Sequence, residues 1–81
     1  MARKRMPTAV ELRCGGGSGH LALARVGIRV SLAVDFDPEK RATYARNFPG
    51  TRLDGRAIER IRGRELGRPD LLLDSPSCQP F

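Results

Sequence analysis

The 81-residue chain has no tryptophan, one tyrosine and three phenylalanines. So few aromatic rings argue against a protein that binds single strands of nucleic acid by stacking successive bases. No apolar run approaches the roughly 18 residues of a membrane-spanning helix. The amino terminus also lacks the charged and apolar pattern of a secretory signal peptide. We therefore expect a cytoplasmic protein that does not contact a membrane.

Cysteine and histidine are scarce as well. Cys14 and Cys78 lie far apart, His20 is the single histidine, and neither cysteine has a second ligand at CxxC spacing. A zinc site is therefore not expected, and we predict no metal-binding residues. Two distant cysteines without a secretion signal fit a reducing compartment.

Positive charge, in contrast, is abundant. Fifteen lysines and arginines stand against nine acidic residues, which gives a net charge of +6. This excess suits a polyanionic partner, although an arginine-rich, solvated surface would explain it equally well. Residues 1–7, with Arg3, Lys4 and Arg5, read as a disordered basic tail. The length allows one small domain, which we place at residues 8–81.

Apolar runs alternate with segments of helical periodicity. This order predicts an α/β fold with one parallel sheet of about four strands, part of a doubly wound architecture. If the strand order is 3-2-1-4, the first and fourth strands are neighbours. The last strand, three leucines between aspartates, would be buried in a complete sheet and would form an open, association-prone edge in a truncated one. Strands are expected at residues 8–13, 28–34, 51–53 and 71–73, helices at 20–26 and 38–47, and a poor helix at 57–66.

The predicted inward residues of the two main helices follow helical spacing. They are Leu21, Leu23 and Ala24 in the first helix, and Ala42, Ala45 and Phe48 in and after the second. Asp37 is a suitable N-cap for the second helix because Pro38 follows it at the first helical position.

A glycine-rich segment, Cys14 to Gly19, follows the first strand and precedes a helix. In doubly wound folds this position binds nucleosides, because glycines let the backbone N–H groups approach the ligand. Asp35 ends the second strand, where a carboxylate can accept both ribose hydroxyls. Together they predict an adenosine-type pocket. One alternative is that Asp35 only caps the following helix. A separate alternative is a dehydrogenase site, because Gly17-x-Gly19-x-x-Ala22 matches the fingerprint of nicotinamide-dependent dehydrogenases.

The leucine strand leads into Ser75-Pro76-Ser77-Cys78-Gln79-Pro80-Phe81. Two prolines stiffen this loop, and it follows the carboxyl end of a parallel strand, where open α/β sheets place their chemistry. Cys78 is therefore a candidate nucleophile. The alternative is a buried cysteine that acts as a small apolar side chain.

Several of these stretches resemble motifs of the DNA (cytosine-5-)-methyltransferases. Glu11-Leu12-Arg13-Cys14-Gly15-Gly16-Gly17 is similar to their first motif, and Val34-Asp35-Phe36-Asp37-Pro38 is similar to their second. Asn47-Phe48-Pro49-Gly50 is similar to a frequent stretch after it, and the Cys78 loop resembles their catalytic Pro-Cys-Gln loop. The resemblance covers about residues 8–81.

The resemblance implies a Rossmann-like methyltransferase that uses S-adenosylmethionine, as in DNA methylation by restriction-modification systems. A cytosine flipped out of double-stranded DNA would be attacked at carbon 6 by Cys78, and carbon 5 would then accept the methyl group. Ser77 and Gln79 would bind the substrate. The cofactor would be bound by Cys14, Gly15, Gly16, Gly17, Asp35 and Phe36.

Three positions depart from the family pattern. Arg13 replaces a phenylalanine that packs on the cofactor, and Ser77 replaces a proline. Gly55-Arg56-Ala57 stands where a Gly-Asp pair contacts the adenine, unless Asp54 substitutes.

The chain also ends before the family's later motifs and target-recognition domain. We therefore expect an amino-terminal fragment that is inactive alone and needs a second chain with the missing motifs. The bacterial cytoplasm or nucleoid would be its compartment. A nonenzymatic cofactor- or DNA-binding remnant and a nicotinamide-dependent oxidoreductase fragment remain alternatives.

Overall fold

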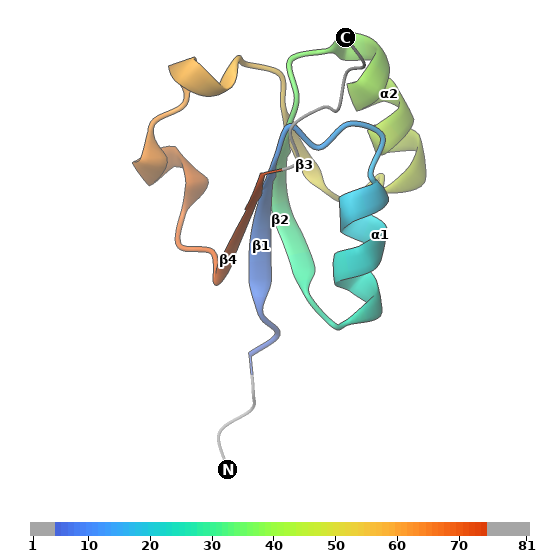
Figure 1. The fold of residues 1–81 in the computed structure, drawn as a ribbon, viewed down its shortest axis with the longest axis vertical. Coiled ribbons are helices and arrows are strands. Elements are labelled where there is room, and N and C mark those ends of the chain that lie inside the picture. The colour runs from blue at the N-terminus through green and yellow to red at the C-terminus, as the bar shows by residue number, and fades with distance from the viewer. Residues whose placement is uncertain (1–4, 75–81) are drawn as a thin grey trace, which may run out of the picture.

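Four parallel strands form a single sheet in the computed structural model, which describes residues 5–74. The strands lie in the order β3-β2-β1-β4 (Figure 1). All neighbours pair in parallel, so the predicted α/β class is confirmed, and β1 and β4 are neighbours. The strands are β1 (Thr8–Leu12), β2 (Arg29–Val34), β3 (Arg52–Asp54) and β4 (Leu71–Asp74).

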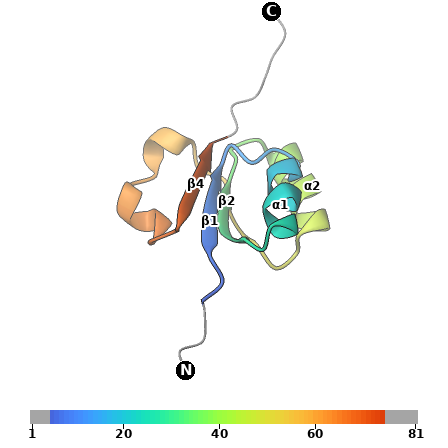
Figure 2. The ribbon, with the colours of Figure 1, turned by 60° about the horizontal axis from the view of Figure 1, so that its bottom comes forward.

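The two faces of the sheet are covered differently (Figure 2). Helices α1 (Ser18–Arg25) and α2 (Pro38–Asn47) lie on one face. Two 3₁₀ turns, η1 (Ile58–Arg60) and η2 (Gly63–Leu66), lie on the other. The segment 57–66 is therefore not one helix. Gly63 lies in its middle, and Glu65 folds back to accept a hydrogen bond from the backbone N–H of Arg62 at 2.8 Å.

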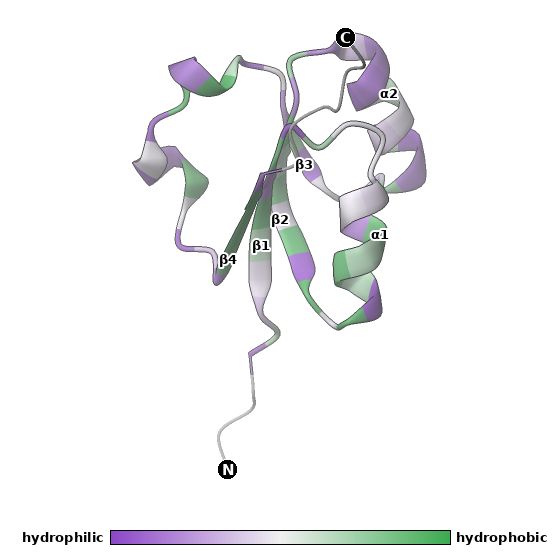
Figure 3. Cartoon of the chain, viewed as in Figure 1, coloured by the Kyte–Doolittle hydropathy of each residue, from purple (hydrophilic) through white to green (hydrophobic). Residues whose placement is uncertain are grey.

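The strands supply the core to both layers (Figure 3). Ala9 and Ala33 pack towards the helices, whereas Val10 and Val34 pack towards the 3₁₀ turns. All four side chains are buried. Because β1 and β2 are covered on both faces, their side chains hold the two layers together.

The helices bury fewer residues than their periodicity predicts. Leu23 is the buried residue of α1, whereas Leu21 is 49% exposed and Ala24 is exposed. Ala42 and Ala45 are exposed too, and Tyr44 is the buried residue of α2. The prediction was wrong for Leu21 and Ala24 because α1 presents only a narrow stripe to the sheet, whereas Leu23 is buried and Phe48 packs against the core.

The start of α2 agrees with its predicted N-cap. A side-chain oxygen of Asp37 accepts hydrogen bonds from the backbone N–H groups of Glu39 and Lys40, at 2.9 and 3.4 Å. Pro38 occupies the first helical position. The alternative that Asp35 caps this helix is therefore wrong.

Strand β4 forms an edge of the sheet, and nothing else in residues 5–74 pairs with its outer side. Leu73 packs against the helical layer, but Leu71 and Leu72 are exposed. Within the described residues β4 is therefore an edge strand. No helix in the described part of the chain has the length and apolar character to cross a membrane.

Candidate functional site

A tight turn after β1 forms one wall of the candidate site. Its backbone takes positive φ at Arg13 (52°), Gly15 (57°) and Gly17 (108°). The N–H of Cys14 donates to the carbonyl of Val34 at 2.9 Å, which holds the turn over the end of β2. Gly17 is then the N-cap of α1. The turn therefore brings the glycines to the carboxyl edge of the sheet, beside the start of a helix.

Asp35 fixes this turn to the next one. Its Oδ2 accepts a hydrogen bond from the N–H of Gly15, and its Oδ1 accepts one from the N–H of Asp37, both at 2.9 Å. The residue is only 8% exposed. Each carboxylate oxygen has two lone pairs, so each retains one for a further donor. Asp35 thus joins the glycine turn to the β2–α2 turn and keeps some acceptor capacity.

Neighbouring residues leave the site open. Phe36, directly after Asp35, is 72% exposed. A Cβ atom added to Gly15 would meet nothing within 4 Å. An exposed aromatic ring and an uncovered glycine backbone therefore lie on either side of a fixed carboxylate.

The structure describes Cys14, whereas Cys78 lies outside the described residues. Cys14 is buried. Burial is the main cause that raises the pKa of its thiol to about 12, and the carboxyl groups of Glu11 and Asp35 add to this effect. The thiol is protonated at neutral pH and is not a nucleophile. Cys78, Ser77 and Gln79 lie outside the described residues, so their predicted roles stay predictions.

A buried polar chain beneath the glycine turn was not predicted from the sequence. The Tyr44 hydroxyl donates to Oε1 of Glu11 at 3.2 Å and lies 2.6 Å from Nδ1 of His20. The hydroxyl and Nδ1 of His20 share a hydrogen bond, and the tautomer of the ring determines which of them donates. The His20 ring also stacks on Phe48 with 3.7 Å between ring centroids. This chain joins β1, α1 and α2 under the candidate site.

The feature of the sequence that could have indicated this buried polar chain is the pair formed by the single tyrosine and the single histidine. Both lie in helices that flank an acidic strand residue. Glu11 is fully buried, and within residues 5–74 its Oε2 has no hydrogen-bond partner. Burial raises the pKa of Glu11, and this effect outweighs the hydrogen bond from Tyr44, which lowers it. Burial therefore shifts Glu11 towards its protonated form relative to an exposed glutamate.

Replacing Glu11 by glutamine should remove a pH dependence of stability. Because the folded-state pKa of Glu11 lies above its unfolded value, the folded state loses stability as pH rises from the ordinary glutamate pKa through the raised one. The Glu11→Gln variant keeps an oxygen acceptor for Tyr44 and should not show this decrease of stability with rising pH. Urea unfolding of both proteins at several pH values between about 4 and 8 measures the difference.

A second carboxylate, Asp54, provides an internal control when the pH series is extended below about 4. Hydrogen bonds from Arg56 lower the pKa of Asp54 to about 2, which gives the opposite slope at lower pH in both proteins. Parallel curves for the two proteins above pH 4.5 would contradict a proton on Glu11.

Comparison with known proteins identifies the family. A family model described as "C-5 cytosine-specific DNA methylase" matches residues 8–81. The chain belongs to this family. The resemblance inferred from the motifs is confirmed.

Relatives within the family include tRNA (cytosine(38)-C(5))-methyltransferases. The Homo sapiens protein is 38% identical over 76 residues, which cover 89% of this chain and 19% of the relative. The Bos taurus protein is 39% identical over 77 residues, which cover 90% and 20%. The crystal structure of a Spodoptera frugiperda DNMT2 mutant superposes with a TM-score of 0.81 at 33% identity, over 93% of this chain and 24% of that one. The chain thus spans about a fifth of the length of its curated relatives.

Two departures from the family pattern have structural consequences. Arg13 donates through Nε to Asp74 at 2.8 Å, so it links the ends of β1 and β4. Asp54, the possible substitute for the adenine contact, accepts from the side chain of Arg56 at 2.8 Å and from its backbone N–H at 2.9 Å. Arg56 also pairs with Glu65 at 2.9 Å. Both positions are therefore occupied by ion pairs within the chain.

The family uses S-adenosylmethionine, and the residues at the carboxyl edge fit an adenosyl group. The open space beside Gly15 admits a ligand close to the backbone. Asp35 retains acceptor capacity for hydroxyl groups, and the exposed ring of Phe36 offers a flat apolar surface. Residues 5–74 contain no cluster of three or more potential metal ligands.

Proposed function

We propose that this chain provides the cofactor-binding edge and the nucleophile loop of a cytosine-5 methyltransferase that acts on nucleic acid. One observation carries the proposal. In a chain that belongs to the family, Asp35 ties the glycine turn to the turn that bears Phe36, at the edge of the sheet where β4 leads towards the Cys78 loop.

Each residue has a proposed role. Asp35 holds the ribose hydroxyls, Phe36 packs on the adenine, and the backbone of Gly15–Gly17 approaches the methionine part, with Cys14 filling the space below. S-adenosylmethionine supplies an electrophilic methyl group when bound.

On the substrate side, the Cys78 thiolate adds to carbon 6 of the cytosine, which makes carbon 5 nucleophilic. Ser77 and Gln79 position the ring. After methyl transfer a base removes the carbon 5 proton, and the bond to Cys78 breaks.

Two polynucleotides are candidates for the substrate. The motifs and the family description favour double-stranded DNA with a flipped cytosine. The relatives at 38% and 39% identity favour tRNA, because both are tRNA methyltransferases by name. Sequence similarity over 89% of the chain is the more specific of the two arguments, so we place tRNA first and DNA second.

Activity should also need the portion of the relatives that this chain does not match. That portion is about four fifths of their length, and we propose that a second chain can supply it. Alone, the chain should bind the cofactor weakly and transfer no methyl group.

Binding of S-adenosylmethionine to the purified chain tests the proposed function. Asp35→Asn should weaken binding by about 1–3 kcal/mol, roughly 5- to 150-fold, because hydrogen bonds to a charged acceptor are lost. Isothermal titration calorimetry measures the affinity. Asp37→Asn is the matched control, since asparagine caps helices as well as aspartate does. A preference for a nicotinamide dinucleotide, or equal losses in the two variants, would contradict the proposal.

A further inference from the structure

An arginine stands at or shortly before the start of every strand. Arg29 and Arg52 are the first residues of β2 and β3. Arg5 and Arg68 each come three residues before β1 and β4. Because the strands are parallel, the starts of β1, β2 and β4 lie close to the sheet edge opposite to the glycine turn. Arg52, at the start of β3, is in register with Leu32, further along β2. The sequence thus concentrates positive charge at the end of the fold that the proposed chemistry does not use.

An irregularity in β2 turns several of its residues towards one cavity. The register passes from Ala9↔Val30 to Val10↔Leu32, so Ser31 is an extra residue in β2. An extra residue breaks the alternation of faces, and a bulge of this kind redirects side chains. Arg29, Ser31 and Leu32 consequently all line the same cavity.

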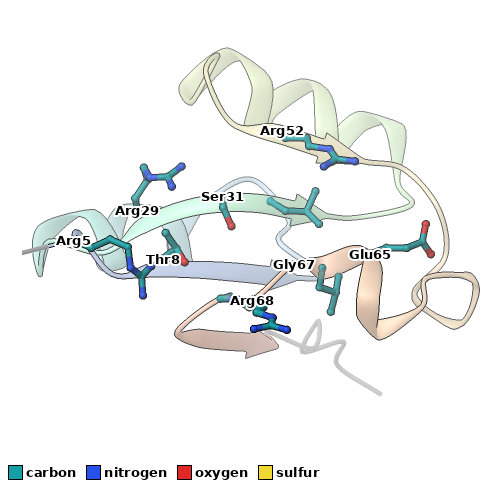
Figure 4. Close-up of a pocket in the computed structure, with 11 residues that line it drawn as sticks. Arg5, Thr8, Arg29, Ser31, Arg52, Glu65, Gly67 and Arg68 are labelled. Carbon is teal, nitrogen blue, oxygen red and sulfur yellow. The ribbon is translucent and has the colours of Figure 1, made fainter.

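The cavity has a volume of about 370 Å³ and lies between the sheet and the segment that leads into β4 (Figure 4). Four segments of the chain contribute its arginines, namely Arg5, Arg29, Arg52 and Arg68. Thr8 and Ser31 add hydroxyl groups, and we call this site the arginine cavity.

Positive charge in the arginine cavity is poorly compensated. Glu65 is the single carboxylate among its lining residues, and it pairs with Arg56 outside the cavity at 2.9 Å. Arg5 pairs with Asp70 at 2.9 Å. The ion pairs formed within residues 5–74 include none to Arg29, Arg52 or Arg68. Three guanidinium groups therefore remain available to an anion.

We propose that the arginine cavity binds phosphate groups of a nucleic-acid backbone. Guanidinium groups present donors in a planar fork that matches phosphate oxygens, and arginines on several strands can bind successive phosphates. A five-residue strand is roughly 17 Å long, so this contact lies well away from the reacting cytosine. The choice of nucleic acid as the source of the phosphates rests on the proposed function.

Paired charge-removing variants test the proposal. Arg29→Gln with Arg52→Gln removes two charges from the cavity. Arg25→Gln with Arg46→Gln removes two from the last turns of α1 and α2, on the other face of the sheet. The probes are fluorescein-labelled RNA and DNA duplexes of about 20 base pairs, chosen to span roughly two helical turns. Fluorescence anisotropy is measured at several salt concentrations.

We expect the cavity variant to bind both duplexes at least tenfold more weakly. The slope of log K against log salt should also fall by about one to two, since each lost phosphate contact removes roughly 0.9. The helix variant should stay within about threefold of the unmodified chain. Equal losses in the two variants would overturn the proposal in favour of net charge alone.

Two further measurements distinguish phosphate backbone binding from binding of free phosphate and from loss of folding. Inorganic pyrophosphate that binds the cavity without competing with either duplex would show a site for free phosphate, and would overturn the nucleic-acid assignment. Circular dichroism verifies folding, and Arg68→Gln, in the loop before β4, replaces the double variant if that variant unfolds. Duplex binding does not require S-adenosylmethionine, so failure of cofactor binding and failure of this proposal give different results.

Discussion

Exchange of Cys78 for serine is expected to abolish methyl transfer and the covalent trapping of a nucleic acid that contains 5-fluorocytosine. A thiolate attacks carbon 6, whereas a serine hydroxyl without an activating base stays protonated and reacts far more slowly. The fluorine at carbon 5 cannot leave as a proton does, so a productive attack leaves the nucleic acid bound to the protein. Denaturing electrophoresis then shows the adduct.

The chain needs the remaining motifs for this experiment. A chimera supplies them if this chain replaces the matching amino-terminal portion of the Spodoptera frugiperda protein, with which it superposes at a TM-score of 0.81. Serine at Cys78 should remove the adduct while S-adenosylmethionine binding stays nearly unchanged. Trapping with tRNA and with duplex DNA in parallel decides between the two candidate substrates.

Cys14 is the matched control in the same chimera. Its thiol is buried and has a pKa of about 12, so Cys14→Ser should leave trapping intact. An adduct on Cys14, located by peptide mass spectrometry, would show that the wrong thiol was assigned as the nucleophile.

The second large effect is expected for Gly17→Ala, which should destabilise the fold by roughly 2–5 kcal/mol. A positive φ costs an L-residue about 1–2 kcal/mol, and overpacking adds about 1–3. The new Cβ would lie near 2.5 Å from Cε2 of Phe48 and 3.3 Å from the ring of Tyr44. Both rings belong to the buried chain under the glycine turn. Urea unfolding measures the loss, which is large against the roughly 5–15 kcal/mol of a typical domain.

Gly63→Ala is the matched control for this substitution. Gly63 lies in η2, its φ is not positive, and an added Cβ would meet no atom within 4 Å. Its effect should stay within about 0.5 kcal/mol, as for most surface substitutions. Equal stability of the Gly17→Ala and Gly63→Ala proteins would contradict the close packing inferred for Gly17.

Local signals explain why much of the fold was predictable. The cap at Asp37 was evident because Pro38 follows it, and α2 runs from Pro38 to Asn47 as predicted. The parallel sheet followed from the alternation of strands and helices along the chain, since right-handed crossovers join parallel strands. Glycine spacing also located the turn after β1. Each of these features depends on residues close together in sequence.

The buried polar chain and the arginine cavity depend on distant residues, and the sequence therefore did not reveal them. Tyr44 lies 33 positions after Glu11, so no periodicity relates the hydroxyl to the carboxyl group that it contacts. Arginines at strand starts look like ordinary solvated residues in the sequence. They form one site only because the sheet brings segments from four parts of the chain together and the extra residue Ser31 redirects part of β2.

The strand order also determines when the sheet can form during synthesis. β1 is the first strand made, yet it lies inside the sheet between β2 and β4. Its second neighbour, β4, is the last of the four described strands, and the hydrogen bond between Thr8 and Asp70 joins residues 62 positions apart. At translation rates of about 5–20 residues per second, that separation corresponds to a delay of about 3–12 s. For that time the nascent chain exposes the unpaired edge of its most buried strand, and an unpaired edge is prone to pairing with other chains.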